Sequence, residues 1–174
     1  MVLASSFVFA VGGQDAVGIY DTAKTYTAAD GKEFQLENME EKDLVRIRAG
    51  GVEANSSLEI TRITSQEKTN LQAGLSNGKT SEIKIMPDTA SEIAMERLGL
   101  KVCSAENNCV IQIKEVGSGE QARAVYEVKA DKKAKLFWIL NTKMNVRAQV
   151  DAQSGNVTQI KKPWWAFLAS ETEQ

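Results

Sequence analysis

The chain has 174 residues, of which 43% are hydrophobic and 25% are charged, and these proportions exclude a wholly disordered protein. The formal net charge is −2 with both signs interspersed, so we expect no nucleic-acid partner. Histidine is absent and only two cysteines occur, which removes the usual general base and the usual ligands of transition metals. The acidic residues form no spaced acid/base pair. We therefore expect a protein that is not an enzyme and that carries no cofactor or metal.

The first residues, MVLASSFVFAV, form a short apolar run without charge, and two glycines follow it. We interpret residues 1–13 as the remnant of a signal peptide, and a buried first strand is the alternative. The run is too short to span a bilayer. The protein is accordingly expected outside the cytoplasm, secreted or at the cell surface.

Residues 17–86 show alternating apolar positions separated by turn residues, which predicts a small antiparallel β region. Val45 and Ile47 alternate with arginines, and a Gly-Gly pair follows them. Asn77-Gly78 lies between two further apolar runs and predicts a hairpin with a type I′ turn.

The apolar period changes after Pro87 and predicts a helix of about three turns that stops at Gly99. Thr89 and Glu92 have the spacing of a capping box, with Asp88 as an alternative cap. The apolar stripe of this helix has to rest on a sheet.

Cys103 and Cys109 flank a polar loop between two strand-like runs. Positions across a hairpin neck lie close enough for a disulfide, so we predict a Cys103–Cys109 bridge, which agrees with export. Two unpaired core thiols or half of a metal site are the alternatives, although no further Cys or His exists to complete a site with soft ligands.

The stretch from Gln121 to Lys162 alternates most clearly and predicts, with the strand before it, four or five antiparallel strands with one apolar face. A polar bend is expected at Asp131-Lys-Lys. Asp151-Ala-Gln-Ser-Gly155 is typical of a tight turn, with Asp151 as a local side-chain cap and Gly155 where φ must be positive.

The helix ASEIAMERLG, the Tyr126-x-Val128 strand and the segment from Val150 to Val157 together resemble a PepSY domain across residues 87–162. Ser154 stands where that family usually has threonine, and LFWILNTK is longer than the usual connection. The resemblance implies a helix on an antiparallel sheet, a place outside the cytoplasm, and peptidase inhibition or protein binding. EIKIMPDTASE and KPWWAFLASE also resemble an uncharacterised archaeal family of exported or membrane-tethered proteins.

The predicted fold class is therefore α+β and mostly antiparallel β, with a small N-terminal β region followed by a PepSY-like helix packed on an antiparallel sheet. The predicted parts are residues 1–13 as a signal-peptide remnant, 17–86 as the β region, 87–162 as the PepSY-like domain and 163–174 as an aromatic tail.

A candidate binding surface is formed by the aromatic residues outside the alternating pattern, namely Phe137, Trp138, Trp164, Trp165 and Phe167. Such side chains serve as rigid anchors in protein interfaces or as peripheral contacts at a membrane surface. Folding back to cap the sheet is the alternative.

The leading functional hypothesis is an extracytoplasmic, non-catalytic binding or inhibitory module that recognises a protein or peptide through a strand edge or these aromatic residues. The alternative is a structural cell-surface protein that self-associates through edge strands. The lysines near residues 129–147 fit either an acidic partner or a solvated hairpin. Asn55-Ser-Ser and Asn156-Val-Thr match the glycosylation sequon.

Overall fold

The computed structural model describes residues 14–15, 24–39, 44–65, 67–137 and 139–171. The first half of the described chain contains β1 (Gln14–Asp15), β2 (Thr25–Thr27), β3 (Glu33–Met39), β4 (Leu44–Ala49), β5 (Val52–Ser56), β6 (Ile60–Ser65), β7 (Lys68–Gly74) and β8 (Thr80–Ile83). The second half contains α1 (Pro87–Leu98), η1 (Ala105–Asn107), β9 (Val110–Val116), η2 (Gly119–Gln121), β10 (Arg123–Leu136), β11 (Leu140–Asp151), β12 (Val157–Lys161), η3 (Trp164–Leu168) and β13 (Ala169–Glu171).

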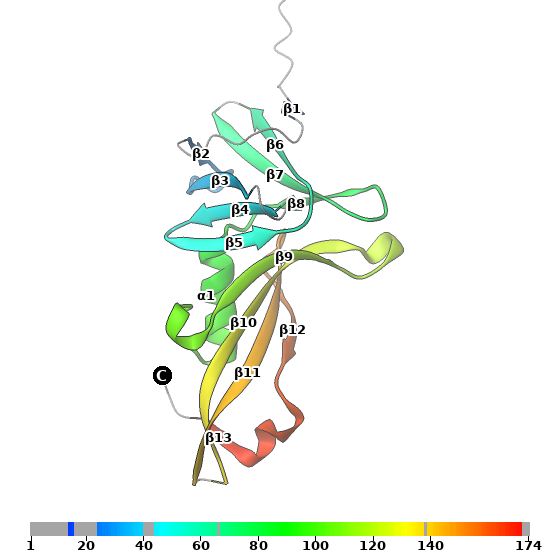
Figure 1. The fold of residues 1–174 in the computed structure, drawn as a ribbon. Coiled ribbons are helices and arrows are strands. Elements are labelled where there is room, and N and C mark those ends of the chain that lie inside the picture. Colours follow the sequence, from blue (N-terminus) through cyan, green and yellow to red (C-terminus); the bar gives the residue numbers. More distant parts are fainter. Residues whose placement is uncertain (1–13, 16–23, 40–43, 66, 138, 172–174) are drawn as a thin grey trace, which may run out of the picture.

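A nine-stranded mixed sheet forms most of the molecule (Figure 1). Its strand order is β12-β11-β10-β9-β5-β4-β3-β2, and β13 pairs with β10. Every pairing in this sheet is antiparallel except that of β5 with β9, which are parallel with Asn55 opposite Gln112. The second sheet has four antiparallel strands in the order β1-β6-β7-β8. Antiparallel sheet is therefore confirmed as the main local structure.

One apolar core joins the two sheets. Phe34 and Ile47 from the large sheet, and Ile60 and Leu71 from the small one, are almost fully buried in the same cluster. The alternation of buried and exposed side chains along β4 and β7 follows the two-residue period of strands.

Helix α1 lies against β4, β5, β10, β11 and β12, so it covers the place where the two halves of the large sheet meet. It begins at Pro87 with Met86 as its N-cap and without a side-chain cap, so the predicted capping box is wrong. The Asp88 carboxylate instead receives a 2.6 Å hydrogen bond from Lys32 Nζ, and Thr89 Oγ1 accepts another from the same amine. The predicted stop at Gly99 is confirmed, with φ 65°.

The predicted fold class is wrong. The protein is mostly β, and its main sheet runs from the N-terminal half into the C-terminal half through the parallel pairing of β5 with β9. The prediction was a separate small β region followed by a helix on its own antiparallel sheet, whereas the structure has a large mixed sheet that spans both halves and a smaller antiparallel sheet beside it. Alternation identifies which side chains share a face of a strand, but it does not identify the neighbouring strand. The parallel pairing of Asn55 with Gln112, 57 positions apart in the chain, therefore leaves no local signal.

Two turns differ from their predictions. The hairpin at Asn77-Gly78 forms between β7 and β8, but only Gly78 has a positive φ, at 77°, so the turn is not of type I′. The bend expected at Asp131 is absent, because β10 continues as one strand to Leu136. The expected signal-peptide remnant at residues 1–13 and the residues 16–23 lie outside the described part of the chain.

Candidate functional site

The hairpin of β10 and β11 projects beyond the rest of the sheet at the lower end of Figure 1. Its strands remain in register to the pair Leu136–Leu140. β13 pairs with the end of β10, with Ala169 opposite Leu136, and Phe137 N donates a 3.3 Å hydrogen bond to Leu168 O. These contacts hold η3 beside the end of the hairpin.

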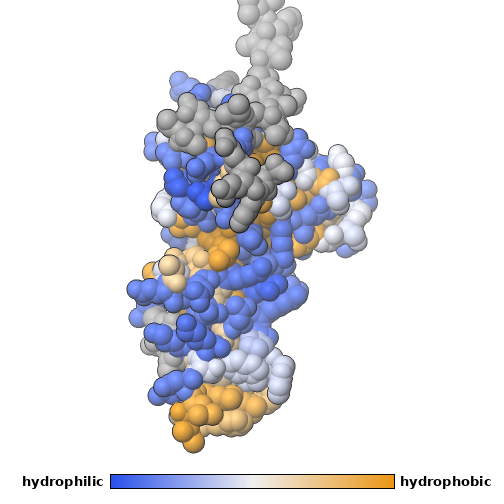
Figure 2. Space-filling view, in the orientation of Figure 1, coloured by the Kyte–Doolittle hydropathy of each residue, from blue (hydrophilic) through white to orange (hydrophobic). Residues whose placement is uncertain are grey.

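Five large apolar side chains from these two segments are exposed to solvent. Their exposed fractions are 56% for Phe137, 81% for Ile139, 60% for Leu140, 79% for Trp164 and 76% for Phe167. We call these five residues the apolar tip. Figure 2 shows hydrophobic residues gathered at this end of the molecule. Exposed apolar side chains that gather in one patch are a common feature of interaction sites.

The predicted aromatic surface is divided by the structure. Phe137, Trp164 and Phe167 are exposed, whereas Trp165 is partly buried and packs against the core. Trp138 lies outside the described residues. No ring contact joins these aromatic residues within the described part of the chain, where the ring pair is Tyr26–Phe34 at 5.6 Å, so they do not form the expected aromatic cluster.

Ile139 and Leu140 were missed by the sequence reasoning. Their signal was the uninterrupted apolar run LFWIL at a place where a solvated hairpin normally has polar turn residues. The sequence prediction took only Phe137 and Trp138 of this run into the candidate binding surface and interpreted the longer stretch LFWILNTK as an insertion relative to the PepSY pattern.

Lysines lie directly behind the apolar tip. Lys135 precedes Leu136 on β10, and Lys143 on β11 lies opposite Lys133. All three side chains are exposed. Lys162 is exposed as well and immediately precedes Pro163 and η3. The tip therefore combines apolar side chains with a positively charged surround.

A second candidate surface is the edge strand β12. It pairs with β11 on one side and ends the strand order of the large sheet, so its other side has no strand partner among the residues that the structure describes. An open groove of about 560 Å³ runs along it, lined by Arg97 of α1 and by residues 156–160. Arg97 is exposed and makes no ion pair within the described ranges, and Ile160 is exposed on the same groove.

The turn before β12 fixes the start of this edge. Asp151 Oδ1 accepts hydrogen bonds from the backbone N–H groups of Gln153 and Ser154 at 3.1 and 2.8 Å, and from Ser154 Oγ at 3.0 Å. Gly155 has φ 74° and its N–H donates to Asp151 O at 2.9 Å. Asp151 and Gly155 thus act on the backbone of the turn, which positions Val157 to begin the strand.

One carboxylate, Glu127 on β10, is almost completely buried among cations. Lys114 and Lys129 pair with it, the latter at 3.1 Å, and Arg147 Nη1 lies 3.6 Å away. Gln149 Nε2 also donates to it at 3.0 Å. Burial alone would raise the pKa of Glu127, but the hydrogen bonds from Lys114, Gln149 and Lys129 outweigh it and lower the pKa to about 2. The group remains ionised and holds three strands together.

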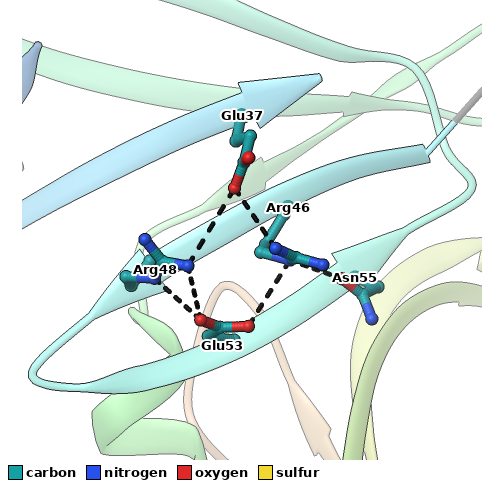
Figure 3. A network of polar contacts seen from close by, with 5 residues as sticks. All are labelled: Glu37, Arg46, Arg48, Glu53 and Asn55. Atoms are coloured by element: carbon teal, nitrogen blue, oxygen red, sulfur yellow. Dashed lines mark hydrogen bonds and ion pairs between the residues drawn. The ribbon is translucent and has the colours of Figure 1, made fainter. Parts of the chain in front are cut away.

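A network of ion pairs lies on the strands β3, β4 and β5 (Figure 3). Arg46 contacts Glu37 at 3.2 Å and Glu53 at 3.4 Å, and Arg48 contacts Glu53 at 2.5 Å. Asn55 Oδ1 accepts a 3.4 Å hydrogen bond from Arg46 Nε. Two carboxylates neutralise two guanidinium groups here. The network therefore links cross-strand neighbours and offers little net charge to a ligand.

The predicted disulfide is confirmed. Cys103 and Cys109 are bonded across the loop that contains η1, with their Cα atoms 5.1 Å apart. The bridge is consistent with an oxidising compartment outside the cytoplasm. Among the described residues, no helix is long and apolar enough to cross a membrane.

No group of three or more cysteine or acidic side chains in the described ranges is placed to hold a metal ion. Comparisons of the chain with protein-family models, with curated proteins and with solved structures gave no match.

Proposed function

We propose that this protein is a non-catalytic binding module that works outside the cytoplasm and takes up an extended segment of a partner protein along β12. The observation that carries the proposal is the edge strand β12 beside a groove lined by Arg97 and Ile160. The disulfide supports the compartment, because such bonds persist where the surroundings are oxidising.

Strand addition explains how such an edge binds. An extended peptide placed about 4.8 Å from β12 exchanges main-chain hydrogen bonds with it, which gives affinity for many sequences. Specificity comes from the contacts that the peptide side chains make with the residues lining the groove beside β12. Thr158 to Lys161 of β12 are exposed while Val157 is half-buried, and no strand of the described residues pairs with the outer edge of β12.

The groove indicates the chemistry of the bound segment. Arg97 presents a guanidinium group with no carboxylate partner in the described residues, which favours an acidic side chain on the peptide. Ile160 offers apolar area at the same groove. The preferred peptide therefore has an acidic residue close to an apolar one.

The PepSY resemblance implies protein binding and so agrees with this proposal. One of the three segments that carry the resemblance, Val150 to Val157, runs from the end of β11 through the turn to the first residue of β12. A PepSY-like module would bind or inhibit another protein without catalysis, which is the role proposed for this edge.

Selection from random peptides displayed on phage tests the proposal. We expect the intact chain to enrich peptides that contain an acidic residue, and Arg97→Glu to bind them at least about tenfold more weakly, since a charge-assisted pair becomes a repulsive one. Lys101→Glu is the matched control, because it makes the same charge change outside the groove. Absence of enrichment, or equal weakening by both variants, would contradict the proposal.

Self-association through the same edge is the second candidate. Two copies related by a two-fold axis can pair β12 with β12 in antiparallel register, which requires the open edge described above. Light scattering across a range of protein concentrations separates the two. If the protein is a monomer at every concentration, the edge does not pair with a second copy, and a peptide remains its proposed ligand.

A further inference from the structure

We infer that the apolar tip inserts into the interfacial region of an anionic lipid membrane and holds the protein at that surface. This inference concerns the other end of the hairpin and does not depend on the peptide edge. It begins from the five apolar side chains that the hairpin and η3 expose together.

The shape of the tip suits a bilayer. The side chains lie on a projecting hairpin and on the adjoining η3, so they form a protrusion at the end of the molecule (Figures 1 and 2). A protrusion of aromatic and aliphatic groups can enter the boundary between headgroups and acyl chains without rearranging the sheet behind it. Trp164 is the residue type that favours this boundary, because its ring is apolar while its N–H reaches water.

The spacing of the lysines matches the depth of such insertion. Lys133 and Lys143 form a cross-strand pair three residues from the Leu136–Leu140 pair, which is about 10 Å along the strands. Lys135 is nearer still. When the apolar residues enter about 5–10 Å, these ammonium groups reach the level of the headgroup phosphates.

The same lysines identify the occupant. Lys135 and Lys143 are exposed cations directly behind the apolar side chains, and anionic headgroups attract such cations at a membrane surface. A second copy on a two-fold axis would bring lysines against lysines, so self-pairing at the tip is disfavoured. Apolar insertion combined with a basic surround supplies the two signals that stable attachment at a membrane surface requires.

The fold holds this tip firmly. The chain runs from β12 into η3 and continues as β13, which pairs with β10. Trp165 packs against the core while Trp164 and Phe167 remain outside. Trp165 thus anchors the short helix, so that the backbone carrying the exposed side chains is already ordered before the protein meets a membrane.

Vesicle binding of the full chain tests the inference, with phosphatidylcholine vesicles that either contain or lack phosphatidylglycerol. We expect preferential binding to the anionic vesicles and quenching of tryptophan fluorescence by brominated acyl chains. The double variant Ile139→Ser/Phe167→Ser should bind at least about tenfold more weakly with an unchanged melting temperature, since both side chains are exposed. Lys135→Gln/Lys143→Gln should lose most of the preference for anionic lipid.

The matched control is Val102→Ser/Val110→Ser, which removes two exposed apolar side chains away from the tip and should bind as the natural chain does. The inference is overturned if the natural chain binds neither kind of vesicle or if the Ile139/Phe167 variant binds anionic vesicles normally. It is also overturned if the chain dimerises in solution and that variant becomes monomeric. These changes leave β12 intact, so failure here is distinguishable from failure of peptide binding.

Discussion

Lys132 Nζ donates a 3.0 Å hydrogen bond to the carbonyl oxygen of Leu98, and the lysine is almost completely buried. The contact joins the middle of β10 to the C-terminal end of α1. A cation at this end of a helix compensates the last carbonyl groups and interacts favourably with the helix dipole. This side chain therefore adds a polar contact to the apolar packing that holds α1 on the hairpin carrying the apolar tip.

Lys132→Met should lower the free energy of unfolding by about 2 kcal/mol, because the methionine fills similar volume but leaves helix-end carbonyls without their charged donor. Lys135→Met is the control, since Lys135 is exposed and should change stability by less than about 0.5 kcal/mol. Chemical denaturation of both variants measures the difference. Equal stabilities would show that the buried amine contributes nothing to the docking of α1.

The lowered pKa of Glu127 predicts how the free energy of unfolding changes in acid. Its pKa is about 2 in the folded protein and near 4.5 when unfolded, so the unfolded chain binds more protons between these values. The stabilisation of about 3 kcal/mol is present above pH 4.5 and is lost as the pH falls toward 2. Unfolding free energies measured across this range should decline steeply.

Glu127→Gln should remove that part of the pH dependence and should itself cost about 3 kcal/mol at neutral pH, because Lys114, Lys129 and Arg147 lose their shared anion. A variant with natural stability at pH 7 would mean that the cations are satisfied by water instead.

Tyr126→Phe should reduce stability by about 1 kcal/mol. Its hydroxyl donates a 2.7 Å hydrogen bond to Ile85 O from a fully buried position, and the variant leaves that carbonyl without this donor. Burial, with the charge of Asp88 adding to it, raises the pKa of Tyr126, so the phenol stays neutral and a donor. Thermal unfolding of Tyr126→Phe beside the natural protein measures the loss, and an unchanged melting temperature would contradict it.

Replacing both cysteines by serine should lower stability by about 2 kcal/mol, because the closed loop is short. The loop should keep its shape, since Ser104 and Asn107 form a reciprocal cap on η1. Thiol titration of the unfolded natural protein without reductant should find no free thiol. Two reactive thiols would contradict the bridge and the oxidising compartment inferred from it.

Local patterns predicted several strands and the disulfide, but not the N-cap of α1 or the turn type at Asn77-Gly78. Tyr126 and Val128 on β10, and Met144 to Val150 on β11, alternate as strand residues do, and both strands form. The cysteine spacing predicted the disulfide. In each case the signal lies within a few residues of the structure that it specifies.

The rest depends on contacts between distant segments. The lysines after Asp131 suggested a bend, but Lys132 turns inward to the end of α1, so the strand continues. The parallel pairing of β5 with β9 and the return of β13 to β10 have no local signature either. Those two pairings determine the single mixed sheet and the placement of η3 beside the hairpin, which is why the sequence indicated aromatic residues but not the apolar tip.

Hydrogen–deuterium exchange of the chain with a selected acidic peptide tests the central proposal most directly. Strand addition should slow exchange of backbone amides within Val157–Lys161, because their outward N–H groups gain partners on the peptide. Amides of β4 and β5, far along the sheet order, should exchange as before. Peptide binding that leaves β12 exchange unchanged would contradict the assignment of this edge as the binding site.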